Sequence, residues 1–422
     1  MRAMKARCLG AMLAAVLLAA CSGAGGGGSG PTTLTLWARD SEKTFIGTIV
    51  DSFNQSHKDI HVNVTIIPAN NSFVQKLGTA TANGSGPDVV SIDLVFVPYF
   101  AKAGALMDIT SRAHGLSYLS GFDSAHMRLA NYNGKLYALP FTAESSVVFY
   151  NKTLFQKAGL DPAKPPATWA ELQDAAVKIR ALGGNTYGYV WPGANGGASI
   201  FELAPFVWAS GGEVVGGNPG QSVPMFNSPA VTDMLTFMHG MVQQGVIPPS
   251  ASTDTTSNSL TSFQSGTVGM TPAGAFFIPQ LDSSKTFDWG VFPIPGRTGG
   301  FASFAGGDEI SVGSNTKNPG AAYTFVQWAT DRVAQTAMAK LGVMPVRLDL
   351  APSIYVPLNP AYSIFVNALQ QGHTVDSTVE NALINDNNGP WATMVHDAIF
   401  NGNVKAAQDA AQAKAQQIVA AG

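Results

Sequence analysis

Acidic and aromatic side chains gather in this sequence where apolar runs end. Trp37, Asp40 and Glu42 follow one such run, and Asp93 interrupts another, where a charge requires a partner. Carboxylates bind paired hydroxyl groups through charge-assisted hydrogen bonds, while aromatic rings cover apolar ring faces. These residues therefore predict a site for a hydroxyl-rich solute. Structural roles stay open, namely a core position for Trp37 and helix capping for Asp40 and Asp93.

Catalysis is an alternative use of the same residue types. Asp93, Glu144, Asp308 and Glu309 supply carboxylates, and a glycosidase needs two of them at a set separation across one bond. The sequence does not define that separation. An assay for released reducing ends distinguishes a glycosidase from a protein that only binds sugar.

Metal and nucleotide chemistry are poorly supported. His57 and His61 have the spacing of a helical metal pair, but a helix should end and a strand begin between them, so their rings should not share a face. No cysteine is placed to complete a metal site. The Gly84-Ser-Gly86 segment precedes its strand, which is the wrong context for a phosphate loop, and no Gly-x-Ser-x-Gly elbow is present. We predict no metal and no cofactor.

The elements that must position the acidic and aromatic residues alternate between strands and helices. Thr168 and Glu171 fit a capping box at the start of one helix. The hydrophobic patterns predict strands at 34–37, 60–66 and 88–94, and helices at 41–56, after Thr168, and near 229–244, 318–340 and 404–420. This alternation predicts an α/β fold with mostly parallel sheets flanked by helices. Ligands of such folds bind at the carboxyl ends of the strands or between two lobes.

The amino end has the features of an exported lipoprotein. A positively charged start is followed by an apolar run that is too short to span a bilayer comfortably. Leu18-Ala-Ala-Cys21 resembles the bacterial lipobox, in which the cysteine becomes the first mature residue and carries a diacylglycerol. We predict a signal peptide at 1–20, and a lipidated Cys21 with a flexible Gly/Ser tether at 21–30. An ordinary secreted protein is the alternative.

The composition indicates a globular binding domain of more than one unit. About 390 residues follow the tether, enough for two domains. Charged residues make up 12% of the chain, roughly half the usual share. The net charge of −3 argues against nucleic acid or an anionic membrane surface as a partner. No later apolar run is long enough for a membrane span, so the sequence predicts a soluble body.

Several segments, taken in order, resemble one family, the extracellular solute-binding proteins of carbohydrate ABC importers, which includes maltose-binding protein. The likeness extends over nearly the whole mature chain, although each motif alone is weak. It rests on Leu34-Thr-Leu-Trp37, Gly86-Pro-Asp-Val-Val90, Asn133-Gly-Lys-Leu-Tyr-Ala-Leu-Pro140, Phe149-Tyr-Asn-Lys-Thr-Leu-Phe155, Phe263-Gln-Ser-Gly-Thr-Val-Gly-Met270 and Gly342-Val-Met-Pro-Val-Arg347.

The resemblance implies a two-lobed clamp of the periplasmic-binding-protein type with an interlobe hinge. The N-terminal lobe would comprise 31–142 plus 296–346, and the C-terminal lobe 146–290 plus 350–422. Such a protein, expected as a monomer anchored on the outer face of the cell membrane, closes around a small carbohydrate and delivers it to the ABC permease.

The resemblance also points to individual ligand-binding residues. Glu144 occupies the first crossing between lobes, where similar proteins have a polar residue that touches the sugar; a hinge-bracing ion pair is the alternative. Phe276, next to Phe277, matches a position where a stacking Trp is common, but Phe lacks the indole N–H. Gly307 belongs to a glycine pair of the family. Asp308 follows this pair, where relatives often have an aromatic or small polar group, and a solvated turn is the alternative for Asp308. Arg347 is a further candidate, and bracing of the second crossing between the lobes is its alternative role. The remaining candidates are Trp191, Asn258 and Trp391.

Two other functions stay open beside glycoside hydrolysis. One is the binding of a phosphorylated polyol or a peptide, which calls for clustered basic residues or helix N-termini at the cleft. Arg39 and Arg347 are the basic residues that we place there, so a neutral sugar is favoured. The other is an envelope adhesin or scaffold, which predicts neither a small ligand nor closure.

Overall fold

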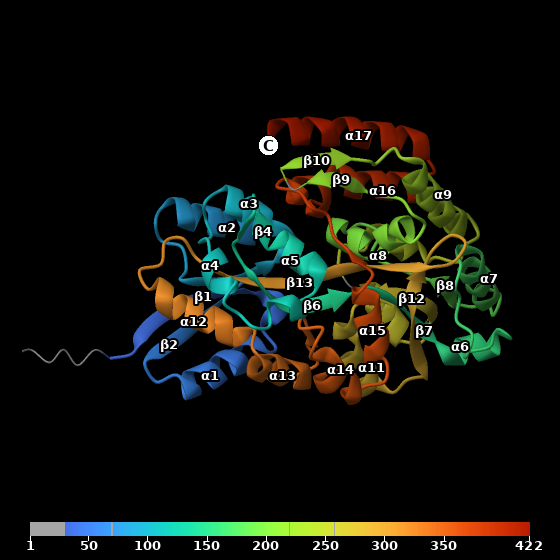
Figure 1. Cartoon of the computed structure of the whole chain (residues 1–422). Coiled ribbons are helices and arrows are strands. Elements are labelled where there is room, and N and C mark those ends of the chain that lie inside the picture. Colours follow the sequence, from blue (N-terminus) through green and yellow to red (C-terminus); the bar gives the residue numbers. More distant parts are fainter. Residues whose placement is uncertain (1–29, 69–70, 219, 257) are drawn as a thin grey trace, which may run out of the picture.

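The protein is an α/β structure with two lobes, seen side by side in a computed structural model (Figure 1). The structure describes residues 30–68, 71–218, 220–256 and 258–422. The predicted signal peptide and Cys21 lie outside these residues. Among the residues that are described, no helix combines the length and the apolar character that a membrane crossing requires.

The first lobe is built on a parallel sheet at the start of the chain. Strand β1 (Thr32–Arg39) lies between β2 (Ile60–Ile67) and β3 (Val89–Asp93) and is parallel to both. Helix α1 (Ile46–Ser56) buries Ile46, Ile49, Val50 and Phe53, whose spacing places them on one helical face. The carboxyl ends of β1 and β3 therefore meet at one edge of the sheet.

The second lobe has its own strands and most of the C-terminal helices. Its strands are β7 (Val147–Asn151), β8 (Tyr187–Tyr189), β11 (Val268–Ala273) and β12 (Trp289–Pro295), in the order β12-β7-β11-β8. The helices of this lobe include α7 (Trp169–Arg180), α8 (Gly196–Trp208), α9 (Pro229–Gln243), α16 (Pro390–Asn401) and α17 (Val404–Ala421).

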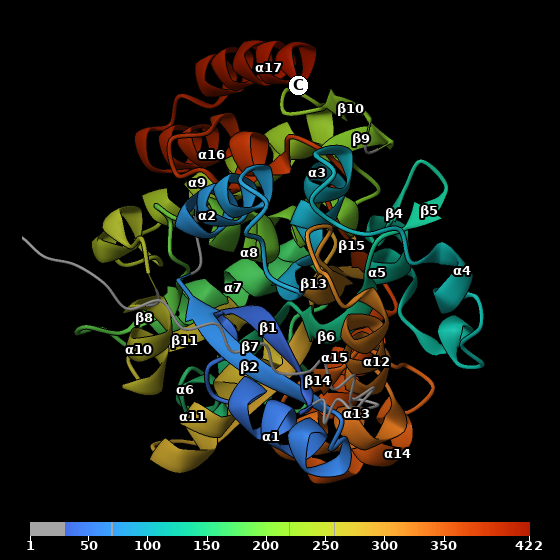
Figure 2. The same cartoon turned by 90° about the vertical axis from the view of Figure 1, so that its left-hand side faces the viewer.

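Strand β13 (Phe301–Val312) connects the two lobes. It pairs with β12 at its start, then with β6 (Leu139–Ser145), and it pairs with β3 towards its end. Strand β6 leads almost directly into β7, so the chain crosses between the lobes at 145–147. Figure 2, turned by 90°, shows β1, β2 and α1 in front of the strands of the other lobe.

The remaining elements are short or flank the two sheets. The other helices are α2 (Asn71–Ala82), α3 (Val97–Lys102), α4 (Thr110–Ala113), α5 (Ser124–Leu129), α6 (Lys152–Lys157), α10 (Asn258–Gln264), α11 (Ile278–Ser284), α12 (Pro319–Ala329), α13 (Arg332–Lys340), α14 (Ala351–Ile354) and α15 (Tyr362–Leu369). The other strands are β4 (Asn131–Tyr132), β5 (Lys135–Leu136), β9 (Val215–Asn218), β10 (Gln221–Pro224), β14 (Met344–Pro345) and β15 (Gly372–His373). Tighter turns occur at Asp40–Glu42, Leu94–Phe96, Leu119–Gly121, Pro249–Thr253, Ala275–Phe277 and Val356–Leu358, with a π-helical turn at Asn381–Asn385.

Most of the predicted elements occur, with three differences. The sheets are mixed rather than mostly parallel, because β7 is antiparallel to both β11 and β12, and β13 is antiparallel to β3, β6 and β12. The helix predicted at 41–56 begins at Ile46, because the segment before it is a 3₁₀ turn that buries Glu42. The helix predicted at 318–340 is two helices, since the carboxylate of Asp331 accepts hydrogen bonds from the N–H groups of Val333 and Ala334 and starts α13. The predicted cap at Thr168 is confirmed, because its hydroxyl accepts a hydrogen bond from the N–H of Glu171.

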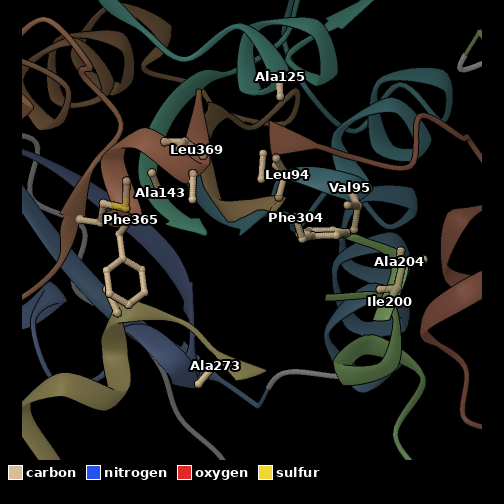
Figure 3. Packing of buried hydrophobic residues seen from close by; sticks show 14 of the residues in the cluster. Leu94, Val95, Ala125, Ala143, Ile200, Ala204, Ala273, Phe304, Phe365 and Leu369 are labelled. Carbon is tan, nitrogen blue, oxygen red and sulfur yellow. The ribbon is translucent and has the colours of Figure 1, made fainter. Parts of the chain in front are cut away.

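Apolar side chains from both lobes pack together beside β13. Figure 3 shows Val95 next to Phe304, with Ile200 and Ala204 of α8 near them. All four side chains are buried. Val95 follows β3 in the first lobe, whereas α8 belongs to the second, so this cluster joins the lobes. We name it the interlobe apolar cluster. The exact lobe boundaries, 31–142 plus 296–346 and 146–290 plus 350–422, stay a prediction.

Gly307 allows β13 to approach β6 closely. Its φ of +127° lies in a region that side chains disfavour. A Cβ atom at this position would lie 2.2 Å from the carbonyl oxygen of Thr142 in β6. The backbone itself therefore requires glycine here, whether or not a ligand touches Gly307.

We expect Gly307→Ala to lower the free energy of unfolding by about 3 kcal/mol, because it adds a backbone overlap to an unfavourable φ. Urea denaturation measures this change. Gly320→Ala is the matched control, since no atom lies within 4 Å of a Cβ there, and its effect should stay within about 0.5 kcal/mol. Equal stability of the two variants would contradict the role of Gly307.

Candidate functional site

An ion-paired arginine lies at the carboxyl end of β1. The Nε of Arg39 donates to Asp308 at 2.7 Å, and its Nη2 lies 2.6 Å from the same carboxylate oxygen. Its Nη1 donates to Asp93 at 3.0 Å. Arg39, Asp93 and Asp308 come from β1, β3 and β13, so three adjacent strands converge on one guanidinium group. We call these three residues the arginine clamp.

The charges of the arginine clamp stabilise one another against burial. Burial opposes the charge of Arg39, but the carboxylates of Asp308 and Asp93 outweigh it and raise the pKa of Arg39. Burial also raises the pKa of Asp93, and Arg39 partly offsets that rise. Thr142 of β6 donates its hydroxyl to Asp308 at 3.3 Å and accepts the Asp308 N–H at 3.0 Å. The clamp is therefore fixed before any solute arrives.

Glu42 lies beneath the clamp and is fully buried. One carboxylate oxygen accepts a hydrogen bond from the Ser91 hydroxyl at 2.5 Å. Burial, and secondarily the negative charge of Asp308, raise the pKa of Glu42 well above its usual value. Glu42 was predicted to contact a ligand, and that role stays a prediction, but its burial favours support of the clamp.

Glu144 occupies the crossing strand β6, opposite Gly306 of β13. Burial raises the pKa of Glu144 to about 7, and the charge of Asp308 contributes to the rise. Near neutral pH its carboxyl group therefore changes between a hydrogen-bond donor and a charged acceptor. Because the pKa rises, the structure does not support the alternative in which Glu144 is held as the charged half of a hinge-bracing ion pair.

Aromatic rings from the second lobe face this polar region. Phe276 is 45% exposed, an unusual exposure for its size, and its ring lies against Gly274. A Cβ atom on Gly274 or on Gly306 would meet the ring of Phe201 from α8 at 3.5 Å. Glycines thus leave room for Phe201 to lie between the lobes. Phe201 is half-buried and was not identified from the sequence.

A cavity of about 500 Å³ lies between the two lobes and brings together two predicted residues, Asp40 and Phe276. The first lobe contributes Asp40, Ser41 and Lys43, while the second contributes Leu260, Thr261, Phe276 and Gln280. Asp40 directly follows Arg39 in the chain, so this wall of the cavity is joined covalently to the arginine clamp. Its size is within the range of small-ligand sites, roughly 300–1,000 Å³.

Two further predicted residues are partly or fully exposed but make contacts within their own lobe. Trp37 is half-buried on β1, and the ammonium of Lys76 lies 5.1 Å from its ring centroid. Asn258 starts α10, where its side-chain N–H donates to Asp254 at 3.2 Å. Ligand contact by either residue stays a prediction.

Three predicted aromatic residues are buried in the second lobe. Trp191 stacks on Phe400, Trp391 packs near Phe226, and Phe277 packs edge-on against Phe149. All three predicted residues have no exposed surface. Their role in binding stays a prediction, but in this arrangement they have no face on which a solute could stack.

Arg347, which lies shortly after β14, is engaged with neighbouring groups of the protein. Its guanidinium donates two hydrogen bonds to Asp349, at 2.7 and 2.6 Å, and lies 4.3 Å from the ring centroid of Tyr118. Arg347 is 5% exposed. These contacts favour its bracing role over hydroxyl binding.

The sequence did not identify Glu380 as a site residue. It is buried, and it accepts a hydrogen bond from Asn385 at 2.9 Å. Burial raises the pKa of Glu380, and the charge of Asp93 adds to the rise, so Glu380 lies within electrostatic range of the clamp. Glu380 directly precedes the π-helical turn at Asn381–Asn385 and belongs to no motif, so its acidic side chain was the only signal in the sequence.

No group of three or more His, Cys, Asp or Glu side chains in the described part of the chain is arranged to hold a metal ion. His57 stacks on Phe53 at the end of α1, whereas His61 is exposed on β2. The two rings thus point to different surroundings, as the sequence predicted.

Comparisons with known proteins show which proteins this chain resembles. Residues 38–336 match the family described as bacterial extracellular solute-binding protein. A putative binding protein of Brucella abortus is 25% identical over 339 residues, which cover 79% of this chain and 80% of the relative. The multiple sugar-binding protein of Streptococcus mutans is 26% identical, covering 75% and 76%. The sn-glycerol-3-phosphate-binding periplasmic protein of Salmonella typhimurium is 27% identical, covering 63% and 61%.

Solved structures share the fold at low sequence identity. A solute-binding protein of an ABC transporter from Thermotoga lettingae, bound to α-D-tagatose, has a TM-score of 0.79 at 22% identity, covering 92% of this chain and all of the other. A cyclic α-maltosyl-1,6-maltose-binding protein of Arthrobacter globiformis has a TM-score of 0.80 at 24% identity, covering 93% and 100%.

The pKa of Glu144 predicts how stability depends on pH. The folded protein holds this proton up to a pH of about 7, whereas the unfolded chain releases it near 4.5, so stability should fall as the pH rises between these values. The loss attributable to Glu144 is up to about 3 kcal/mol. We expect Glu144→Gln to remove this loss, so that the variant gains stability relative to wild type from pH 5 to pH 8.

Chemical denaturation at several pH values measures the difference between variant and wild type. Asp51→Asn, on the exposed side of α1, is the control and should give a difference that is flat with pH. A flat difference for Glu144→Gln as well would show that Glu144 does not hold a proton in the folded state.

Proposed function

Because the chain belongs to the bacterial extracellular solute-binding protein family, we propose that it captures a small neutral carbohydrate between its lobes and delivers it to an ABC permease. Relatives that are named as sugar-binding proteins support this proposal. Membership in a family of binding proteins also answers the glycosidase alternative. Its carboxylates would hold hydroxyl groups rather than cleave a glycosidic bond.

The observation that carries the proposal is the contrast between the two walls of the interlobe gap. One wall presents Asp40 beside the arginine clamp, and the other presents the exposed ring of Phe276. A sugar ring has hydroxyl groups at its edge and apolar C–H groups on its faces. The polar wall can bind the hydroxyls while the aromatic wall covers a face.

The arrangement also explains how binding would favour closure. The hydroxyl-binding groups and the aromatic ring belong to different lobes, so a solute contacts both walls only when the lobes are close together. A solute that makes more contacts in the closed arrangement shifts the population towards it. The permease can then distinguish loaded from empty protein by the relative position of the lobes.

A phosphorylated polyol is the alternative, and two observations keep it open. One relative is named as a glycerol-3-phosphate-binding protein, and Lys43 lines the cavity beside Asp40. Against it, the guanidinium of Arg39 already uses three nitrogens on Asp308 and Asp93. A phosphate would also approach several carboxylates. The balance of charge therefore favours a neutral ligand.

A thermal-shift screen tests the proposal. Tagatose, maltose, mannotriose and sn-glycerol 3-phosphate cover a monosaccharide, two oligosaccharides and the phosphorylated alternative. A sugar at a thousandfold excess over its dissociation constant should stabilise the protein by about 4 kcal/mol. Stabilisation by glycerol 3-phosphate alone would replace the carbohydrate proposal, and a shift with none of these compounds would count against it.

A pair of variants locates the site that the screen reports. Phe276→Ala should weaken the binding of an active sugar by at least about tenfold, because it removes the exposed ring of one wall. The matched control is Leu182→Ala, which truncates an exposed apolar side chain after α7 and should leave affinity unchanged. Unchanged affinity in Phe276→Ala, measured by calorimetry, would exclude this wall.

We also propose that the protein is tethered as a monomer to the outer face of the cell membrane through a lipid on Cys21, as the lipobox-like segment indicates. A diacylglycerol thioether needs the cysteine thiol, so Cys21→Ser should move the protein from the membrane to the soluble fraction. Fractionation of cells with immunodetection measures this. Retention of Cys21→Ser in the membrane fraction would refute the anchor.

A further inference from the structure

A second and larger cavity, of about 1,160 Å³, lies between the lobes away from the gap just described. Helix α5 and the β4–β5 hairpin line it from the first lobe. The β9–β10 hairpin lines it from the second, and residues 373–376 complete it. We call it the lateral groove. Its volume slightly exceeds the roughly 1,000 Å³ of large small-molecule sites, so an oligosaccharide would fit.

Packed side chains separate the lateral groove from the interlobe gap. The ring of Phe304 packs at a tilt against Phe201, with centroids 5.6 Å apart, and against Trp208, with centroids 6.0 Å apart. Phe304 also belongs to the interlobe apolar cluster, which Figure 3 shows between β13 and α8. A solute in the groove is therefore distinct from a solute held by Phe276 and Asp40.

A flat aromatic surface supports the groove. The imidazole of His373 stacks on the indole of Trp208 with centroids 5.2 Å apart and planes 13° apart. His373 lines the groove and is half-buried. Burial lowers the pKa of His373 below its usual value, so the ring is uncharged at neutral pH. An uncharged ring held flat by a second ring is suited to cover the C–H face of a sugar.

Polar groups at the edge of this surface are held in place by the protein. Glu213 accepts hydrogen bonds from the Trp208 indole at 2.7 Å and from the Val214 N–H at 2.8 Å. Arg128 of α5 donates to Asp376 at 2.5 Å and to Thr374 at 3.0 Å. Groups that are already oriented lose little entropy when a solute binds.

The charges of the groove select against anions. Arg128 and Asp376 neutralise one another as an ion pair. Glu213 adds a second carboxylate to the lining, against the single guanidinium of Arg128. Together with the aromatic surface, this balance fits a neutral polyhydroxyl compound better than a phosphate or a carboxylate.

From these contacts we propose that the lateral groove is a second saccharide site, which binds a neutral oligosaccharide on the His373 ring between Glu213 and the Arg128–Asp376 pair. This site does not require that the interlobe gap binds sugar.

The test follows the ring C–H signal of His373 by NMR during titration with maltotriose and with mannotriose. The signal is assigned by its loss in His373→Ala. We expect it to shift in wild type and also in Phe276→Ala, where the interlobe gap is impaired. We expect Gly220→Trp to weaken the titration by about tenfold or more, since the indole would occupy the groove.

Gly220 is a suitable place for this change, because it lines the groove and no atom lies within 4 Å of a Cβ there. Gly320→Trp, at an equally open glycine on α12, is the matched control and should leave the titration unchanged.

Three outcomes decide between the sites. No shift of the His373 signal with either sugar would overturn the second site. A shift that Phe276→Ala abolishes and Gly220→Trp does not would also overturn it, but would support the interlobe gap. A shift that survives Phe276→Ala, in a protein whose calorimetric binding is unaffected by that variant, would instead refute the proposed gap site.

Discussion

The contact of Arg39 with Asp93 and Asp308 is the constraint on which the arrangement of the first lobe depends. One guanidinium group ties together the ends of β1, β3 and β13, which are adjacent in the sheet. Burying either carboxylate without Arg39 would cost several kcal/mol. The ends of the three strands therefore have to bring the side chains of Arg39, Asp93 and Asp308 into contact. Asp40, which lines the interlobe cavity, directly follows Arg39 at the end of β1. The ion pair and one wall of the cavity therefore depend on the same strand end.

This shared role has an electrostatic consequence. The clamp holds one positive and two negative groups, and Glu42, Glu144 and Glu380 lie within electrostatic reach of its acidic members. Burial raises the pKa of all three glutamates, because charged forms lose hydration. The region consequently carries protons as well as charges, and its hydroxyl-binding groups include donors and acceptors. That mixture matches a sugar hydroxyl, which also donates and accepts, better than it matches an anion.

The sequence predicted the parts of this site that depend on local pattern. Asp93 was recognisable because a charge ended an apolar strand, and Phe276 was found through its position in a family motif. The pairing of Arg39 with Asp308 was not predictable in this way, because the two residues are 269 positions apart and meet only when β13 pairs with β3.

The aromatic residues of the site were also hard to predict. Phe201 has the sequence context of an ordinary helix residue, and its exposure depends on Gly274 and Gly306 in other elements. Trp191 and Trp391 were chosen for their size; their role in binding stays a prediction, and their burial favours packing.

Strand β13 carries the constraints of both lobes within a few residues. Phe304 packs in the interlobe apolar cluster, whereas Asp308 is fixed in the arginine clamp. Gly306 and Gly307 separate these two positions and lie against β6, the other strand that crosses. A change in the relative position of the lobes would have to bend this glycine backbone together with the adjacent β6. The arginine clamp and Glu144 lie directly beside that backbone, so a solute bound there would contact groups on both sides of it.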